Sequence, residues 1–260
     1  MRSDSIKTRH DRVGLTPADS RRYARHIVLK GLGAPGQQRL KAARVLIVGA
    51  GGLGAPLVAY LAAAGIGRIG IADDDVVALS NLQRQIVHTE HGIGENKAQS
   101  AARFAGALNS GIAVTVLTER ITAGNGAALM ADFDIIADGT DSFAARAGIA
   151  AAAEAARKPL VSGAVSMFDG QVTVFSPHLG DADGTPLPRF VDLYPETPNA
   201  ESLPSCEAVG VIGALTGVIG TLMAMEVIKL ATGIGTPLCG RLLVYDGRGA
   251  RFSELTYRRR

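Results

Sequence analysis

Short uninterrupted apolar runs alternate along the chain with longer stretches in which apolar residues recur at helical spacing. Such runs are typical of strands buried on both faces of a parallel sheet, and the intervening stretches predict crossover helices. Helices are expected over Leu53–Ala64 and Ser142–Arg157. The expected strands are Arg44–Val48, Arg68–Ala72, Ile112–Leu117, Asp134–Ala137, Leu160–Ser162, Gln171–Ser176, Leu242–Tyr245 and Arg251–Thr256. This alternation predicts an α/β fold with a doubly wound, mostly parallel sheet and additional C-terminal strands.

The alternation is interrupted between Pro177 and Pro204, where prolines are frequent and no periodicity is visible. Connections of this length are usually functional or disordered, so we expect a flexible crossover loop over residues 177–207. One domain is expected over residues 22–257. A polar extension, residues 1–21, precedes it, and a basic tail, residues 258–260, follows it.

A glycine-rich apolar segment, Val209–Met225, comes directly after this loop. It is shorter than the roughly 20 residues that a membrane span requires, and Glu226 and Lys229 follow it. We interpret it as a buried helix whose glycines let a neighbouring element approach closely, and we expect no membrane association. The polar N-terminal stretch has no apolar run of the kind found in secretion signals.

Composition narrows the classes of function. The net charge is only +3, and part of the excess lies in the terminal Arg258, Arg259 and Arg260. Binding to nucleic acid is therefore not expected, because it requires a clustered basic face. Two cysteines in 260 residues cannot form a disulfide framework, which favours a reducing, cytoplasmic location.

A glycine fingerprint lies between the first expected strand and the helix that follows it. Gly49, Gly51 and Gly54 occupy the three glycine positions of the G-x-G-x-x-G pattern, and Gly52 adds a fourth glycine. The glycines permit a tight turn, close approach of phosphate to the backbone, and close helix–strand packing. Asp73 ends the second strand, where its carboxylate can accept hydrogen bonds from ribose hydroxyls. These features predict a Rossmann-like nucleotide site.

The residues after Asp73 favour a triphosphate over a dinucleotide. Arg84 lies in the run SNLQRQ, and Lys97 lies in GENK. A helix N-terminus can largely satisfy the diphosphate of NAD, whereas a reacting triphosphate requires additional cations and a metal ion. Each of these cations taken alone is also compatible with an ordinary solvated surface charge.

Two carboxylates follow the fourth expected strand, in the run DGTD. Asp138 ends the strand and Asp141 lies three residues later, at the edge of the sheet where ligands bind. A carboxylate at this place suits Mg²⁺ bound together with substrate phosphates. Residues alone leave open whether Asp141 serves the metal or caps the helix beginning at Ser142.

Taken together, these motifs resemble the MoeB/ThiF/HesA family, the bacterial relatives of ubiquitin-activating enzymes. The resemblance runs from about Arg22 to Thr256. The matching stretches are RYARHIVL, RVLIVGAGGLG, the Asp73-to-Asp75 cluster, LSNLQRQ, GENKAQSA, DGTDS, PLVSGA, GQVTVF and the Cys206-to-Lys229 segment.

The resemblance implies a role for each matching residue. Asp73 is the expected ribose ligand, and Asn81, Arg84 and Lys97 are the expected triphosphate ligands. Asp141 is the carboxylate linked to Mg²⁺ through ATP. The resemblance also implies a homodimer in which Arg25, in RYARH, reaches the ATP site of the neighbouring subunit, and it makes the glycine-rich helix an interface element.

The implied activity is ATP-dependent adenylylation of the C-terminal Gly-Gly carboxylate of a ubiquitin-like sulfur-carrier protein, of the molybdopterin or thiamine type. Pyrophosphate is released, and a separate sulfur donor, such as a cysteine desulfurase or a rhodanese, then thiolates the carrier. Cys206 matches the cysteine that some family members use covalently, and whether this chain does so is left open. Cys239 has no counterpart and is expected to be inert.

The sequence departs from the family pattern at the zinc-binding cysteines and at the residue after the catalytic aspartate. Many relatives bind structural zinc through two Cys-x-x-Cys pairs, but the first pair is replaced here by Leu187–Pro188–Arg189–Phe190 and the second is absent before the terminal arginines. Zinc is therefore not expected. The asparagine that usually follows the catalytic aspartate is Ser142 in this chain.

Two other enzymatic functions were weighed. A dehydratase acting on threonylcarbamoyladenosine in tRNA shares the fold, but it would need a basic face and not the RYARHIVL segment. An NAD-dependent oxidoreductase is compatible with the glycine fingerprint, but no hydride-transfer constellation is visible. A non-catalytic binding module is disfavoured because Arg84, Lys97 and Asp141 are all present.

Overall fold

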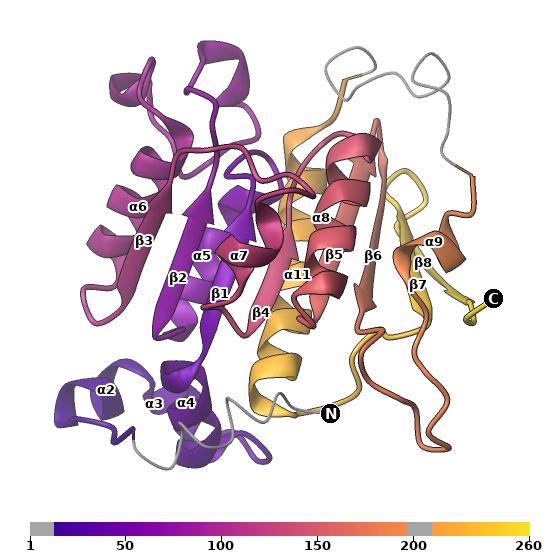
Figure 1. The fold of residues 1–260 in the computed structure, drawn as a ribbon. Coiled ribbons are helices and arrows are strands. Elements are labelled where there is room, and N and C mark those ends of the chain that lie inside the picture. Colours follow the sequence, from indigo (N-terminus) through magenta and orange to yellow (C-terminus); the bar gives the residue numbers. More distant parts are fainter. Residues whose placement is uncertain (1–12, 197–209) are drawn as a thin grey trace.

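A single eight-stranded sheet organises the chain, with strand order β3-β2-β1-β4-β5-β6-β7-β8 (Figure 1). The computed structural model describes residues 13–196 and 210–260. The strands β1 to β5 are parallel, whereas β6, β7 and β8 pair antiparallel to their neighbours. The strand bounds are β1 Arg44–Val48, β2 Arg68–Ala72, β3 Ala113–Leu117, β4 Ile135–Asp138, β5 Leu160–Ser166, β6 Asp169–Phe175, β7 Arg241–Asp246 and β8 Arg251–Thr256. The predicted doubly wound sheet with additional C-terminal strands is confirmed.

Helices cover both faces of the parallel half of the sheet (Figure 1). The helices α5, α6 and α11 share one apolar core, and α7 and α8 pack on the opposite face in a second core. The α-helices are α2 Pro17–Arg22, α3 Ala24–Ile27, α4 Gly33–Ala42, α5 Gly54–Ala64, α6 Lys97–Leu108, α7 Gly126–Met130, α8 Phe143–Ala155, α9 Phe190–Leu193 and α11 Gly213–Thr232. Two short 3-10 helices, η1 Leu79–Asn81 and η2 Glu90–Gly92, precede α6.

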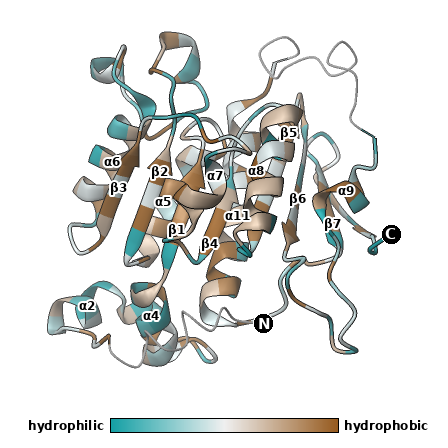
Figure 2. Ribbon diagram, in the orientation of Figure 1, coloured by the Kyte–Doolittle hydropathy of each residue, from teal (hydrophilic) through white to brown (hydrophobic). Residues whose placement is uncertain are grey.

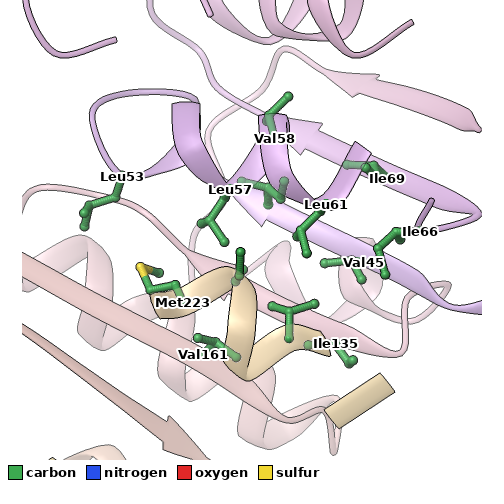
Figure 3. Close-up of a cluster of buried hydrophobic side chains, with 14 of the residues drawn as sticks. Val45, Leu53, Leu57, Val58, Leu61, Ile66, Ile69, Ile135, Val161 and Met223 are labelled. Atoms are coloured by element: carbon green, nitrogen blue, oxygen red, sulfur yellow. The ribbon is translucent and has the colours of Figure 1, made fainter. Parts of the chain in front are cut away.

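The larger core lies between α5, α11 and the central strands (Figure 3). Leu57 and Leu61 of α5 face the sheet residues Val45 and Ile135, while Met223 of α11 closes the cluster. Residues of the central strands are hydrophobic almost throughout (Figure 2), as expected for strands covered on both faces. Truncating either leucine to alanine would cost about 2–5 kcal/mol, because both are fully buried.

The helix α11 confirms the expected buried helix, although it spans Gly213–Thr232 and therefore ends later than the predicted segment. A Cβ at Gly220 would lie 2.3 Å from Cγ of Pro56 in α5, so this glycine permits close packing within the chain. It therefore does not by itself indicate a subunit interface. By length and composition alone α11 could cross a membrane, but it packs against α5, β5 and β6 with over half of its apolar window buried.

Several elements were not foreseen from the sequence. The helices α2, α3 and α4 lie at the amino ends of the strands (Figure 1), and α2 begins inside the expected polar extension and ends one residue beyond it. Its N-cap Thr16 forms a capping box with Asp19, which also pairs with Lys41 of α4. Part of the expected flexible loop contains α9, where Phe190 packs in the second core. The remainder of that loop lies outside the described residues.

Candidate active site

A cavity of about 730 Å³ opens where β1, β2, β4 and β5 end. This is the carboxyl edge of the parallel sheet, where open α/β folds bind ligands. Eight of the predicted site residues line this one cavity: Gly49, Gly51, Gly52, Asp73, Asn81, Arg84, Lys97 and Asp141. The chain therefore brings together residues that are more than ninety positions apart in the sequence.

The glycine loop between β1 and α5 lines the cavity. Gly49 has a positive φ of +88°, a conformation that glycine adopts at little cost. Gly54 does not line the cavity but begins α5, and a Cβ there would lie 1.9 Å from the Gly49 carbonyl oxygen. No side chain caps the start of α5. The Ala55 and Leu57 amides donate to backbone carbonyls and Pro56 has no N–H, so only amides that precede Ala55 are available to an anion.

Asp73, at the end of β2, holds the glycine loop from one side. Its Oδ2 accepts a hydrogen bond of 2.7 Å from the Ala50 amide, and its Oδ1 accepts one of 2.9 Å from the Asp75 amide. Partial burial raises the pKa of Asp73, and these hydrogen bonds oppose that effect. Each oxygen retains a free lone pair, so the carboxylate can still accept from a ribose hydroxyl.

The three expected triphosphate ligands differ in their local partners. Lys97, the first residue of α6, is largely buried and pairs with Oδ2 of the exposed Asp75 at 2.5 Å. This hydrogen bond lowers the pKa of Asp75. Arg84 donates to the Ser80 carbonyl at 3.1 Å and has no carboxylate partner in the described part of the chain. Asn81 is buried, and its side-chain oxygen accepts from the Ala78 amide.

The two aspartates after β4 have different environments. Asp138 is fully buried, which raises its pKa to about 6, although its Oδ1 accepts hydrogen bonds from the amide and hydroxyl of Thr140. Asp141 is exposed at the cavity, and no described residue pairs with it. Ser142, not Asp141, caps α8, because its hydroxyl accepts from the Ala145 amide. The capping alternative for Asp141 is therefore wrong.

Sequence reasoning missed other polar residues of the cavity. Gln85 is buried beside Gly51, and its Oε1 has no partner. Arg146 of α8 lines the cavity on the side of Asp141, and its buried Nε also has no partner. A possible signal for Arg146 was its position as a lone cation in an alanine-rich helix directly after DGTDS. His88 lies beneath the glycine loop, where its Nε2 contacts the Ala50 carbonyl.

One further predicted residue, Arg25, is not part of this cavity. Arg25 is exposed on α3, at the amino end of the sheet and therefore opposite the cavity (Figure 1). Cys206 lies outside the described residues. Within residues 13–196 and 210–260, no group of three or more His, Cys, Asp or Glu side chains could hold a metal ion, and the absence of zinc stays a prediction.

The fold is shared with structures of about one-fifth sequence identity. Escherichia coli MccB with ATP matches at a TM-score of 0.78 and 20% identity, covering 92% of this chain and 72% of that one. A structure of PaaA matches at a TM-score of 0.72 and 23% identity, covering 94% and 75% of the two chains. At this identity the likeness establishes the fold alone.

Curated relatives are considerably more similar. The probable adenylyltransferase/sulfurtransferase MoeZ of Mycobacterium tuberculosis is 47% identical over 92% of this chain, which spans only 60% of that protein. The sulfur carrier protein adenylyltransferase of Thermus thermophilus is 44% identical, over 92% of this chain and 87% of that protein. Residues 23–260 match the model of the ThiF family. The chain therefore belongs to the ThiF family.

Proposed function

We propose that this protein uses ATP to adenylylate the C-terminal Gly-Gly carboxylate of a ubiquitin-like sulfur-carrier protein. The observation that carries the proposal is the single cavity in which a glycine loop, Arg84, Lys97 and Asp141 meet. Amides and cations of this kind suit a polyphosphate with a charged leaving group. Both relatives are named as adenylyltransferases, and one is named as a sulfur carrier protein adenylyltransferase. These names support the same reaction.

The reaction joins the carrier to the nucleotide in one displacement. A carboxylate oxygen of the carrier attacks the α-phosphorus of ATP, the bond from that phosphorus to the bridging oxygen breaks, and pyrophosphate leaves. The products are an acyl-adenylate and pyrophosphate. No proton moves, because the attacking carboxylate is already ionised at neutral pH. Catalysis then consists of positioning and charge stabilisation, which fits a site built from amides, cations and a carboxylate.

Different residues of the chain bind the phosphates, orient the ribose and bind the carboxylate. The amides of the glycine loop and the guanidinium of Arg84 bind phosphate oxygens, while Lys97 is held at the same wall by Asp75. Asp73 orients the ribose. Arg146 lines the same cavity, and we assign it to binding of the carboxylate of the carrier.

The donors present fit Mg²⁺ bound together with the nucleotide. Asp141 offers an exposed carboxylate at the cavity, and Mg²⁺ in such sites takes one or two carboxylates plus substrate phosphates. No group of three acidic, imidazole or thiol ligands occurs among the described residues, so nucleotide phosphates and water would supply the other ligands. Bound there, the ion would neutralise charge on the phosphates.

We further propose a cytoplasmic homodimer in which Arg25 of one subunit serves the site of the other. Arg25 lies at the end of the sheet opposite its own cavity, so it can serve a site only in a neighbouring subunit. A separate sulfur donor, such as a cysteine desulfurase or a rhodanese, would then convert the adenylate to a thiocarboxylate. The carrier could belong to molybdopterin or thiamine synthesis.

The proposal is tested by ATP–pyrophosphate exchange with purified candidate carriers of the molybdopterin and thiamine types. Exchange should require Mg²⁺ and a carrier with an intact terminal Gly-Gly. A carrier lacking the last glycine is the matched control and should not support exchange. Absence of exchange with every carrier, or binding of NAD as tight as that of ATP, would contradict the proposal.

A further inference from the structure

The peptide groups on either side of Ala50 are both held by side chains, one partly buried and one buried. The Ala50 amide donates to Oδ2 of Asp73 at 2.7 Å, and the Ala50 carbonyl lies 3.0 Å from Nε2 of His88. Ala50 itself is completely buried between the first two glycines of the loop. The segment that precedes Gly51 therefore has little freedom to rotate.

The partners of His88 fix its tautomer. A carbonyl oxygen can only accept, so Nε2 of His88 must carry the proton and donate it to Ala50. Nδ1 is then an acceptor, and it lies 2.9 Å from the hydroxyl of Ser100 on α6. His88 and Ser100 are 6% and 2% exposed, so water does not compete for these hydrogen bonds. Burial also lowers the pKa of His88, and Lys97 adds to this effect, whereas the hydrogen bond to Ala50 and the charges of Asp73 and Glu95 oppose it.

The hydrogen bond to Ala50 controls the direction of the next amide. The Ala50 carbonyl and the Gly51 N–H belong to one planar trans peptide, so they point in opposite directions. With the carbonyl turned to His88, the Gly51 N–H must point away from it. Gly51 lines the cavity, and its N–H has no acceptor among the described residues. Such an unpaired amide is what an anionic ligand requires.

We propose that His88, supported by Ser100, is a positioning residue that holds the Ala50–Gly51 peptide with its amide toward the phosphates of the nucleotide. The inference rests on the proposed use of ATP. Without the hydrogen bond this peptide could flip, because Gly51 tolerates the φ values that the flipped form requires. The flipped form would present a carbonyl oxygen to the phosphates instead of a donor, and binding of the polyphosphate would weaken.

Two substitutions at one position separate the two hydrogen bonds of the ring. The amide nitrogen of glutamine can occupy the place of Nε2, so His88→Gln keeps a donor for Ala50. Asparagine is one methylene shorter and reaches only the place of Nδ1, so His88→Asn leaves the Ala50 carbonyl without a donor. We expect His88→Asn to weaken ATP binding about tenfold, the value of one hydrogen bond to a site of this kind, and His88→Gln to stay within about threefold of wild type. The loss of ATP affinity in Ser100→Ala should lie between the losses in His88→Gln and His88→Asn.

The experiment measures the affinity of the purified full chain for ATP and for adenosine, which lacks phosphates, in separate titrations. A positioning role predicts that His88→Asn weakens ATP binding but changes the affinity for adenosine less than about twofold, with the KM for ATP in the exchange assay rising more than kcat falls. Equal losses for ATP and adenosine, equal effects of asparagine and glutamine, or unchanged ATP binding in His88→Asn would overturn the inference. If His88→Asn does not fold, wild-type ATP affinity in Ser100→Ala would overturn it. Failure of the wild-type chain to bind ATP would instead contradict the proposed function.

Discussion

The wall of the cavity formed by the glycine loop, Asp73 and Lys97, here called the nucleotide wall, has most of its polar groups hydrogen-bonded within the chain. Asp73 holds Ala50, Asp75 holds Lys97, and His88 holds the Ala50 carbonyl. The wall formed by Asp141 and Arg146, here called the acyl wall, is different. Asp141 has no described partner, and the buried Nε of Arg146 is unpaired.

This difference between the two walls indicates which ligand each wall is suited to bind. A wall that is hydrogen-bonded before any ligand arrives loses little conformational freedom on binding, so it is suited to an invariant group such as the nucleotide. A wall with unpaired charges and polar atoms depends on ligands to complete it. Asp141 and Arg146 therefore belong to the side where metal-bound phosphates and the carboxylate substrate would meet.

The largest expected effect lies on the acyl wall, at Asp141. Asp141→Ala should reduce ATP–pyrophosphate exchange by at least about a thousandfold, because the phosphates lose the carboxylate that links them to Mg²⁺. Stability should be unaffected, since Asp141 has no described partner. The matched control is the neighbouring Ser142→Ala, which removes the cap of α8. It should cost about 1 kcal/mol of unfolding free energy but keep most of the activity. Exchange that survives in Asp141→Ala would remove this residue from the mechanism.

The second prediction concerns whether the active site needs Arg25 from the neighbouring subunit. Arg25→Ala and Asp141→Ala should each be inactive alone. If Arg25 acts on the neighbouring subunit, a fully exchanged equal mixture contains hybrid dimers with one intact site, which restores about a quarter of wild-type activity. Exchange of subunits is verified with differently tagged chains. A mixture that stays inactive after verified exchange would contradict action between subunits.

The contrast between the walls also explains which features the sequence could predict. Some signals are local and lie next to strands with clear apolar patterns: the glycine fingerprint, Asp73, and the two cations Arg84 and Lys97. The structure brings these residues to one cavity. The strands β1 and β2 begin and end at the predicted residues for the same reason. Asp141 was ambiguous because a carboxylate before a helix serves a cap or a ligand equally well, and only the hydroxyl geometry of Ser142 separates the two.

Other features depend on contacts that no local pattern records. The roles of His88 and Ser100 arise because α6 brings the hydroxyl against the ring beneath the glycine loop. The helix α9 is held by an aromatic cluster around Phe190, in a proline-rich segment that gives no periodic signal. The helices α2 and α3 have six and four residues with none buried, which is too short for a periodic pattern to be visible.

The third prediction concerns the buried carboxyl of Asp138, at the end of β4. The pKa of Asp138 is raised to about 6, chiefly by desolvation, from an ordinary value of 3.8. Between these values the folded chain binds the proton more tightly than the unfolded chain, so this group makes stability fall as pH rises from about 4 to about 6. The total loss is about 3 kcal/mol. Asp138→Asn should lack this contribution while keeping an acceptor for Thr140.

Urea unfolding of both proteins at intervals between pH 4 and pH 7 measures this contribution. The stability of Asp138→Asn relative to wild type should rise across this range and level off above pH about 6. Other carboxylates titrate equally in both proteins and cancel in the difference. Parallel stability curves would show that Asp138 is ionised in the folded chain at all these pH values.

The smallest expected effect concerns the thiol. Cys206 lies outside the described residues, and none of the described residues lining the cavity is a cysteine. In the proposed reaction, adenylylation uses the groups of the two walls together with Arg84 and Arg25 of the neighbouring subunit. A thiol could act only after the acyl-adenylate has formed. Cys206→Ala should therefore keep ATP–pyrophosphate exchange within about twofold of wild type, whereas transfer of sulfur to the carrier would fall if the thiol acts covalently.

Cys239→Ala is the matched control, because burial raises the pKa of the Cys239 thiol and makes it a poor nucleophile at neutral pH. It should leave both exchange and sulfur transfer unchanged. Loss of exchange in Cys206→Ala, with an unchanged circular dichroism spectrum, would place the thiol in the first chemical step. The site would then require a third contributing segment, and the division of the reaction between the nucleotide wall and the acyl wall would be incomplete.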